Sequence, residues 1–560
     1  MKRVMQRSWK NRFPFLVAAV GVVVFFSLGF FAGSDNDLYL KIYRGIDTFG
    51  RVYKEITVNY VDEIDPEKFM RAGIDGMLKT LDPYTVYIGA QDRDEIDLVT
   101  NGKYGGVGIT IGIRDGVVTV VNLLDGFSAA KQGIRVGDRI LAVDGKDLTD
   151  ISMNELRSIV RGAPGTEVHM KIERDGERAP LEFVLLREEI SVKNVTYEGY
   201  VDKGIGYIRL ERFSRTAGDD VRLAMKALQS KGELKSVILD LRDNPGGLLD
   251  MAVDVAAKFL PESSLVVTTK GRQRGSDRLY YTDETPMAPD APLAILVNRG
   301  SASASEIVAG AIQDLDRGVI VGTRTFGKGL VQTITRLSEN SSLKITTGRY
   351  YTPSGRSIQE IDYFNRTRNG GVRIIPDSLR KAFRTAHNRE VFEGGGIKPD
   401  STVPDDELSQ FATELIRKAM FFKFATQYAG KHDALPPDFK VTDQLVNEFE
   451  RFVKEKGFKY QEEPELKLAE LRSSAEESHY GKQFLDQLDH LSSIIKDEEA
   501  HAFGRHKDEI ARLLTEELIE RFRGERARIA STLGDDQQLA AAIALLKNKA
   551  EYQRLLAGTN

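Results

Sequence analysis

The stretch that decides the fold is VNRGSASASEIVAGAIQD at residues 297–314. It joins an apolar run, LAILV at 293–297, to a helical pattern that begins at the serines, with a turn through Arg299 and Gly300 between them. A hydroxyl at such a strand-to-helix turn lies exposed at the edge of a sheet, and the helix N-terminus favours negative charge that develops there. The pattern is therefore typical of a nucleophilic serine. The alternative is an ordinary helix cap, because residues 303–306 also match the S-x-x-E capping box.

A second segment, DLRDNPGGLL at residues 240–249, predicts a strand followed by a glycine pair that opens a helix. Backbone N–H groups at such a turn can bind an oxyanion or a phosphate. An ordinary tight turn explains the same pattern equally well, so this segment is informative only in combination with others.

A third segment, GTRTFGKG at residues 322–329, looks like a phosphate-binding loop but departs from one at two points. Gly329 stands where a Ser or Thr would hold magnesium, and the LVQTITRL that follows alternates like a strand where a helix is required. ATP binding is therefore not expected. If the segment continues as a strand, Lys328, Leu330 and Gln332 share one face. The alternative is an exposed lysine on an edge strand.

Composition narrows the possible chemistry. The chain has 560 residues, too many for one domain, and its 79 Lys and Arg against 83 Asp and Glu give a net charge of −4. Basic residues cluster only at the extreme N-terminus, so nucleic acid is not an expected partner. Cysteine is absent, which excludes thiol nucleophiles, thiolate metal sites and disulfides. Histidine is absent between residues 170 and 386, so a serine activated in this region needs a lysine as its base.

No metal or cofactor is implied by the sequence. His501 and His506 are five residues apart and off a shared helical face, and no HExxH motif occurs. The chemistry that remains belongs to hydroxyl, amine, carboxylate and imidazole groups.

The chain divides by pattern into regions. Residues 190–360 alternate strands with helices, and their strands are apolar on both faces, which predicts an α/β core. Residues 100–188 form short alternating segments punctuated by DG and GD turns and interrupted by one helix; with the YGGVGI at its start, this order resembles a PDZ domain. Residues 36–92 and the chain after Asp400 show helical spacing. The polar residues 265–292 are expected to form a loop or hairpin over the site.

The N-terminus carries a membrane signal. Residues 1–12 contain five basic residues and no acid, and residues 13–34 contain no charge and are long enough to cross a bilayer. Positive charge before the span and acids after it orient the N-terminus toward the cytoplasm. We expect an uncleaved anchor with the bulk of the chain exported. The alternative is a cleaved signal peptide, although GFFAGS is a poor cleavage site.

The three core segments gain meaning together with LDPYTVYI at 81–88, ITTGRYYTPSGRSIQ at 345–359 and GGGIKPD at 394–400. This combination resembles the carboxyl-terminal processing peptidases, a serine/lysine family with a PDZ domain and a crotonase-like α/β core. The resemblance covers residues 38–404. It is interrupted at residues 361–393, where a surface insertion or hairpin is expected.

The resemblance implies the catalytic residues. The family's nucleophile corresponds to Ser303, its general base to Lys328 and its lysine-orienting glutamine to Gln332. The candidates for the oxyanion hole are the backbone amides of Gly246 or Gly247 and of Ala304. For Lys328 to act as a base near pH 7 to 8, burial must lower its pKa by roughly 2.5 to 3 units, and a glutamine can accept a hydrogen bond from the amine without adding charge.

The resemblance also implies how substrate is bound. The family's carboxylate-binding loop corresponds to Tyr104, Gly105, Gly106, Val107, Gly108 and Ile109. Backbone N–H groups of this loop would take the terminal carboxylate of a protein or peptide that adds as a strand, with an apolar terminal side chain beside Val107 and Ile109. Arg161, at the end of the PDZ helix, is a candidate for signalling ligand occupancy to the core; a solvated surface arginine is the alternative.

We therefore predict a multidomain α+β chain. Its expected parts are a basic tip with a membrane anchor or signal (1–34), a helical region (35–95), a PDZ domain (96–188), a serine protease core (189–404) and an all-helical domain (405–560). The helical domain can pack on the core, form homo-oligomers or dock an adaptor.

The expected function is a serine endopeptidase of the bacterial cell envelope, anchored in the inner membrane, with its catalytic part in the periplasm. It would recognise substrate C-termini through the PDZ domain and cleave with a Ser/Lys dyad. The alternative is a non-catalytic PDZ and helical scaffold with a degenerate protease core. A trypsin-fold PDZ protease would need an all-β domain with a histidine before the PDZ domain, and the sequence predicts neither.

Overall fold

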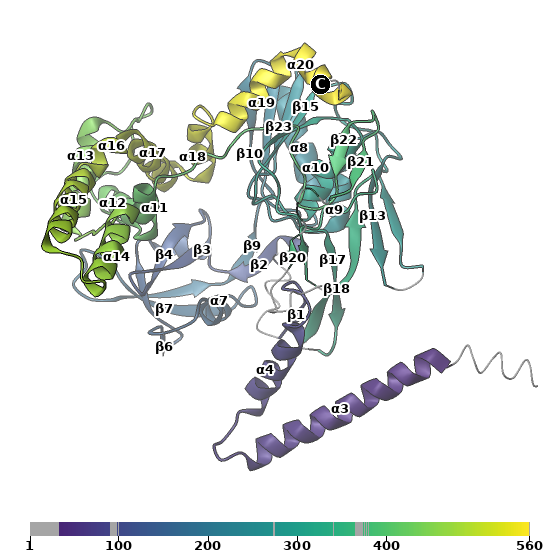
Figure 1. Cartoon of the computed structure of the whole chain (residues 1–560), viewed down its shortest axis with the longest axis horizontal. Coiled ribbons are helices and arrows are strands. Elements are labelled where there is room, and N and C mark those ends of the chain that lie inside the picture. The colour runs from purple at the N-terminus through teal and green to yellow at the C-terminus, as the bar shows by residue number, and fades with distance from the viewer. Residues whose placement is uncertain are drawn as a thin grey trace, which may run out of the picture. The chain divides into compact units, whose positions relative to one another are not determined.

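The computed structural model describes residues 33–89, 98, 100–272, 275–339, 341–363, 373, 374, 376, 378 and 380–558 (Figure 1). The chain divides after Tyr87 into two compact units. In the described part of the chain, no helix is both long enough and apolar enough to cross a membrane. The span expected at residues 13–34 lies outside the described residues except for its last two positions.

The N-terminal unit is built on α3 (Gly33–Asn59) and α4 (Pro66–Leu78), followed by the short strand β1 (Val86–Ile88). The side chain of Asp65 caps α4 by accepting two N–H groups of its first turn, as a helix start requires. The helices expected in this region are confirmed.

The next region has the strand order of a small barrel-like sheet. Its elements are β2 (Lys103–Gly106), β3 (Ile109–Arg114), β4 (Val117–Leu123), α6 (Ser128–Gln132), β5 (Arg139–Val143), β6 (Lys146–Asp147), α7 (Met153–Val160), β7 (Glu167–Glu173), β8 (Leu181–Leu186) and β9 (Glu188–Ser191). The sheet order is β3-β4-β5-β7-β8, with β6 on β5, while β2 pairs with β9. Leu156 and Val160 of α7 pack into the core of the sheet. Strand β3 ends the sheet order, which leaves an edge for an added strand.

The α/β core is organised around a six-stranded sheet. In the described residues it consists of β10 (Val195–Asp202), β11 (Ile205–Leu210), β12 (Ser236–Asp240), β15 (Leu293–Val297), β16 (Val319–Gly322) and β23 (Ser401–Thr402), in that order. β10 and β11 are antiparallel, and the remaining neighbours are parallel. Every residue of β12 and β15 is buried, which confirms strands covered on both faces.

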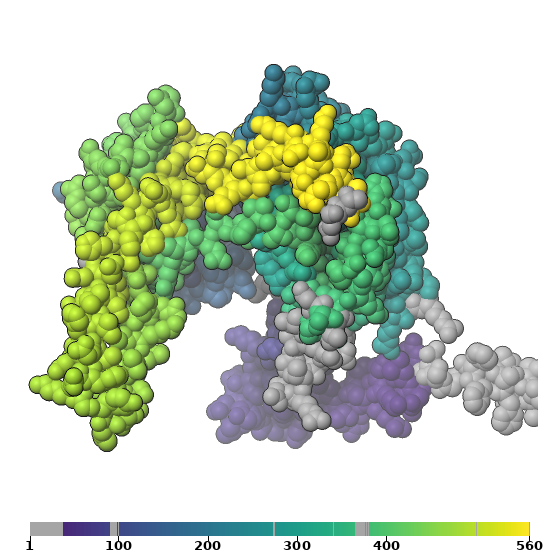
Figure 2. All heavy atoms as spheres, turned by 45° about the horizontal axis from the view of Figure 1, so that its top comes forward, coloured from purple at the N-terminus to yellow at the C-terminus, as the bar shows by residue number. Residues whose placement is uncertain are grey.

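Different helices cover the two faces of this sheet. One face packs against α8 (Ala217–Lys231), α9 (Leu249–Ala257) and α10 (Ala304–Asp314). The other face packs against α19 (Gln537–Lys547) and α20 (Lys549–Ala557), which come from the far end of the chain (Figure 2). Part of the C-terminal helical region therefore packs on the core, one of the arrangements that the sequence left open.

A second, antiparallel sheet flanks the core. Its strands β17 (Leu330–Arg336), β18 (Ser342–Tyr351), β13 (Leu265–Gly271) and β14 (Arg278–Tyr281) are neighbours in that order. The β13–β14 hairpin accounts for the polar region expected to form a loop or hairpin. The interruption of the family pattern contains two further strand pairs, β19 (Ile361–Asp362) with β20 (Arg373–Ile374) and β21 (Ala382–Arg384) with β22 (Glu390–Phe392).

The remaining helices lie between residues 410 and 532. They are α11 (Gln410–Arg417), α12 (Met420–Ala429), α13 (Asp443–Glu455), α14 (Glu463–Glu477), α15 (Lys482–Ala500), α16 (Ala502–Arg505), α17 (Lys507–Arg523) and α18 (Glu525–Thr532). All of them except α14 and α15 contribute residues to a separate apolar core. Phe411, Phe424 and Phe449 lie at the centre of this core and make edge-to-face ring contacts. The predicted multidomain α+β class, with an α/β core and helical regions at both ends, is confirmed.

Candidate active site

Ser303 lies on the turn between β15 and α10, in a strained backbone conformation. Its φ of 56° and ψ of −111° place a residue with a side chain in the left-handed half of conformational space. Ser301 and Ser305 are fully buried, and their hydroxyls donate to the carbonyls of Leu241 and Asn244 at 2.7 and 2.9 Å. Ser303 is only half-buried. The two outer serines of the SASAS run therefore hold the turn, and the middle one presents its side chain.

The glycine pair lies directly against this turn. A Cβ on Gly246, whose φ is 97°, would come within 2.7 Å of the Ala302 carbonyl oxygen and 2.8 Å of the Ala304 nitrogen, so only glycine fits. The Gly246 N–H donates to Oδ1 of the buried Asn244 at 2.9 Å. In contrast, the N–H groups of Gly247 and Ala304 have no acceptor among the described residues.

Lys328 lies in the loop that joins β16 to β17, two residues before β17 begins at Leu330. The segments that carried the family resemblance surround this loop. The Thr325 N–H donates to the Ile397 carbonyl at 3.1 Å, and the Gly329 N–H donates to Oε1 of Gln359 at 2.7 Å. Lys328 itself is half-buried.

Glu306 joins the serine turn to the lysine loop. One of its oxygens, Oε2, accepts the backbone N–H groups of Ser303 and Lys328, each at 2.9 Å. The other, Oε1, accepts the Thr325 hydroxyl at 2.6 Å and the Gly327 N–H at 2.7 Å. Burial raises the pKa of this fully buried carboxyl to about 7, although the four hydrogen bonds oppose that rise.

Tyr350, at the end of β18, contacts the same two residues from another direction. Its hydroxyl lies 3.2 Å from the Ser303 carbonyl oxygen and hydrogen-bonds the Lys328 carbonyl. The ring is 1% exposed. The sequence indicated Glu306 only as part of a capping box and Tyr350 only as part of a motif. A charged residue within the apolar run IVAGAI was the available signal that Glu306 is buried and needs partners.

Gln332 lies on β17, close to the lysine loop in sequence. Its Nε2 donates to Oγ1 of Thr346 at 3.3 Å. The pairing of β17 with β18 shifts register between Val331 and Gln332, and Lys328 precedes the strand. The shared face expected for Lys328 and Gln332 assumed that both residues belong to one strand. Lys328 lies before β17 begins at Leu330, so that assumption does not hold.

The predicted carboxylate loop combines paired and unpaired backbone. Tyr104, Gly105 and Gly106 belong to β2, and Ile109 begins β3. Val107 and Gly108 connect the two strands; both are buried, and their N–H groups have no acceptor in the described part of the chain. Such a pair of unpaired amides favours an anionic ligand.

Arg161 lies at the C-terminal end of α7, over this loop. Its guanidinium stacks 4.4 Å from the centre of the Tyr104 ring. Burial raises the pKa of the Tyr104 phenol, while Arg161 and Arg212 lower it. Because Arg212 follows β11 of the α/β core, the pKa of Tyr104 is influenced by cations of both the loop's own region and the core.

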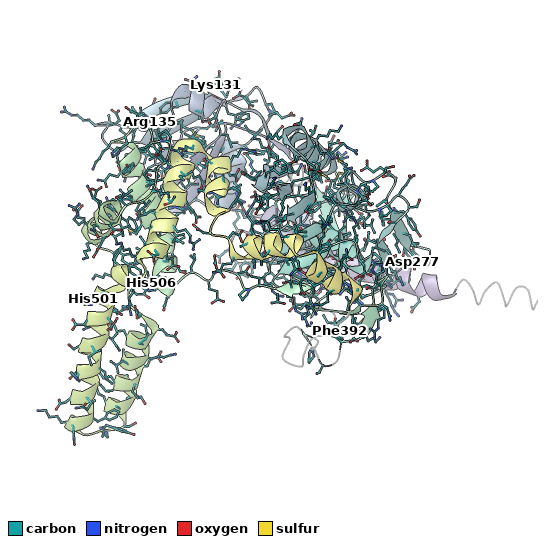
Figure 3. The ribbon with its side chains drawn as sticks, turned by 90° about the horizontal axis from the view of Figure 1, so that it is seen from above. Lys131, Arg135, Asp277, Phe392, His501 and His506 are labelled. Carbon is teal, nitrogen blue, oxygen red and sulfur yellow. The ribbon has the colours of Figure 1, made fainter. Side chains whose placement is uncertain are left out.

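No group of three or more His, Asp or Glu side chains suited to a metal ion occurs in the residues that the structure describes. His501 and His506 flank the short helix α16, away from the core sheet (Figure 3).

Models of known families match successive parts of the chain. Peptidase family S41 matches residues 204–366, and a PDZ domain matches 119–174. The C-terminal helical domain of a probable PDZ-protease matches 411–546, and the N-terminal domain of the activating protease CtpB matches 34–92.

Full-length relatives give the same result. A carboxy-terminal-processing protease of Bartonella bacilliformis is 41% identical over 338 residues, which cover 60% of this chain and 75% of the relative. The chain belongs to peptidase family S41. Two other relatives are the carboxyl-terminal-processing protease of Synechocystis, 38% identical over 51% of this chain and 68% of its own, and the carboxy-terminal processing protease CtpB of Bacillus subtilis, 30% identical over 68% and 80%. This S41 chain is a serine-type peptidase of the carboxy-terminal processing family with a PDZ domain, as its sequence predicted.

Proposed function

We propose that this S41 chain is an endopeptidase that binds protein C-termini in its PDZ domain and cleaves with Ser303 as nucleophile and Lys328 as base. The observation that carries the proposal is the shared Glu306 oxygen. Since the Ser303 and Lys328 nitrogens each lie 2.9 Å from that one atom, they are at most twice that distance apart. Two residues 25 positions apart in sequence are thereby held as neighbours.

The chemistry follows from this arrangement. Ser303 Oγ attacks the carbonyl carbon of a peptide bond while the neutral Lys328 amine takes the hydroxyl proton. The resulting ammonium gives a proton to the leaving amine, and a water activated by the same lysine then hydrolyses the acyl-enzyme ester. Gln332 is the proposed acceptor that orients the amine without adding charge.

For the oxyanion hole we propose the amides of Gly247 and Ala304. Both N–H groups lack another acceptor among the described residues, whereas the Gly246 N–H is committed to Asn244. Gly246 is then required as the residue that lets the turn approach Ser303. Preorganised donors of this kind contribute on the order of 10² to 10³ in rate each.

Substrate selection is assigned to the PDZ loop. The Val107 and Gly108 amides, unpaired in the described residues, can bind a terminal carboxylate while the peptide adds to the edge of β3. We further propose that residues 13–34 anchor the chain in the inner membrane with its catalytic part in the periplasm, because they carry no charge and follow five basic residues.

The test is proteolysis of an unfolded protein substrate by the full-length chain and by Ser303→Ala and Lys328→Ala. Both variants are expected to lose activity, while Ser230→Ala and Lys226→Ala, on the solvent side of α8, retain it. Proteolysis that survives either site substitution refutes the dyad. In the wild type, activity should rise with pH around an apparent pKa well below the ordinary value of lysine, about 10.4.

A second arm tests the PDZ assignment. A peptide substrate with a free C-terminal carboxylate is compared with the same peptide amidated at its C-terminus. We expect the amide to raise KM with little change in kcat, because the PDZ loop contacts the terminus and not the scissile bond. Equal KM values for both peptides would remove the PDZ loop from substrate binding.

A further inference from the structure

We infer that Glu306 and Tyr350 are a pair of positioning residues that set the separation between Ser303 and Lys328. The inference rests on the proposed dyad and extends it to two side chains that take no part in the bond-making or proton-transfer steps. Glu306 binds the N–H groups of both dyad residues, and Tyr350 contacts the carbonyls of both.

The Glu306 contribution comes from a rigid element. α10 begins at Ala304, directly after Ser303, and all of its residues are buried. The side chain of Glu306, three positions after Ser303, therefore reaches both backbones from a fixed base. Through Thr325 and Gly327 the same carboxylate also fixes the residues just before the lysine.

Tyr350 contacts the carbonyl groups of Ser303 and Lys328, whereas Glu306 binds their N–H groups. The backbone N–H of Tyr350 donates to the Gly329 carbonyl at 3.0 Å, so β18 is already tied to the end of the lysine loop. The hydroxyl lies within hydrogen-bond distance of both carbonyl oxygens, that of Lys328 and, at 3.2 Å, that of Ser303, so its one proton can be donated to either. Both backbone polar groups of Lys328 are thus bound by side chains that also contact Ser303.

This arrangement matters because the lysine loop has no regular secondary structure of its own between β16 and β17. Proton transfer from the serine hydroxyl requires the base within hydrogen-bond reach, about 3 Å. A misplacement of about 1 Å can cost roughly 10²-fold in rate. Side chains that hold the two backbones together therefore control the rate without contacting substrate.

The experiment compares Tyr350→Phe and Glu306→Gln with a matched control in the full-length chain. Tyr350→Phe removes only the hydroxyl. Glu306→Gln keeps the size of the side chain but places an NH₂ group where N–H donors point. The control is Tyr200→Phe, because the Tyr200 hydroxyl also lies 3.0 Å from two carbonyl oxygens, those of Leu228 and Gly232, but away from Ser303.

Three quantities are measured: the kcat and the KM for a peptide substrate, and the rate at which a fluorophosphonate probe labels Ser303. We expect kcat and the labelling rate to fall about tenfold in Tyr350→Phe and about 10²-fold in Glu306→Gln, with KM within about twofold of wild type. Tyr200→Phe should leave both unchanged. Thermal unfolding shows whether each variant is folded, and Tyr350→Phe alone decides the result if Glu306→Gln does not fold.

The outcomes separate this inference from the proposed function. If Ser303→Ala is inactive but Tyr350→Phe has the kcat and labelling rate of Tyr200→Phe, the positioning role is wrong and the dyad stands. An increase in KM without a decrease in kcat would likewise contradict it. If Ser303→Ala remains active, the proposed function fails and this inference fails with it.

Discussion

The serine turn and the lysine loop form the same site, but different kinds of contact hold their backbones in place. The backbone of the serine turn is held by side chains and also by backbone bonds: the Ala302 N–H donates to the Asn244 carbonyl, and the Ile307 N–H donates to the Ser303 carbonyl. The lysine loop also has backbone bonds, such as that from the Phe326 N–H to the Ser301 carbonyl, but the N–H groups around the lysine itself go to side chains. The N–H groups of Gly327, Lys328 and Gly329 donate in succession to side-chain oxygens of Glu306 and Gln359.

This difference indicates which contacts fix the geometry of each half of the site. A turn fixed between a buried strand and a buried helix keeps its geometry when one contact is lost, because many backbone bonds remain. In the lysine loop, the N–H groups from Gly327 to Gly329 go to two side chains, so the backbone next to the base depends on each of those side chains. We therefore expect backbone changes to be most damaging at the serine turn and side-chain truncations to be most damaging at the lysine loop.

The largest effect is expected for Gly246→Ala. The added Cβ would lie 2.7 Å from the Ala302 oxygen and 2.9 Å from the Ser303 Cβ, and the backbone atoms there cannot shift without moving the nucleophile. We expect kcat to fall by 10² to 10³-fold, on the order of a lost oxyanion donor. Gly327→Ala, whose nearest contact is the Glu360 side chain at 2.7 Å, should cost about tenfold.

The matched control is Gly145→Ala. Its φ of 78° carries a similar conformational strain, but an added Cβ would meet nothing within 4 Å. Its kcat should equal that of wild type. A Gly327→Ala variant less active than Gly246→Ala would reverse the assigned difference between the two halves.

A smaller effect, on stability, is expected where the halves meet at Glu306. The folded chain binds a proton at Glu306 below about pH 7, whereas an unfolded chain binds it only below the ordinary value of 4.5. Between these values the folded state holds more protons, so this group raises the free energy of unfolding as pH falls from 7 to 4.5, by up to about 3 kcal/mol. Above pH 7 that contribution is lost.

Urea unfolding of wild type and Glu306→Gln across pH 4.5 to 8 measures this contribution. The difference in stability should shift in favour of wild type as pH falls, because glutamine does not titrate. Tyr350→Phe keeps the carboxyl and should retain the wild-type pH dependence. A difference between wild type and Glu306→Gln that is constant with pH would show that Glu306 is ionised throughout.

The same contrast explains what the sequence could predict. The LAILV strand, the serine turn and the helix after it are contiguous, so local pattern was enough to expect an exposed hydroxyl at residue 303. The conformation of Lys328 depends on Gln359, Tyr350 and Ile397, which are distant in sequence. Only the family resemblance brought these segments together beforehand. It identified them as motifs without indicating that they surround the lysine loop.

Gln332 illustrates the limit of periodicity. Period two applies only within a strand, and β17 begins at Leu330, so the face that Leu330 and Gln332 share does not extend to Lys328 in the preceding loop. The C-terminal helices α19 and α20 illustrate another limit: their apolar spacing predicted helices but could not indicate that the sheet face of Tyr207 and Ile238 would be their partner.

The smallest effect on kcat is expected for two amide side chains, one beside the lysine loop and one beside the serine turn. Gln359 accepts one N–H of the lysine loop, that of Gly329, at 2.7 Å. Asn298 accepts two near the serine turn, those of Asp243 and Gly300, at 2.9 and 3.0 Å. By number of bonds, Asn298→Ala should be the more harmful change. We expect the opposite for kcat, about tenfold lost in Gln359→Ala and threefold or less in Asn298→Ala. A lost hydrogen bond is worth roughly 1 kcal/mol, and the Gly329 N–H lies next to the base, whereas Asp243 and Gly300 do not adjoin Ser303 in sequence. Steady-state kinetics with a peptide substrate measures both. A larger loss in Asn298→Ala would show that the serine turn depends on single side chains as much as the lysine loop does.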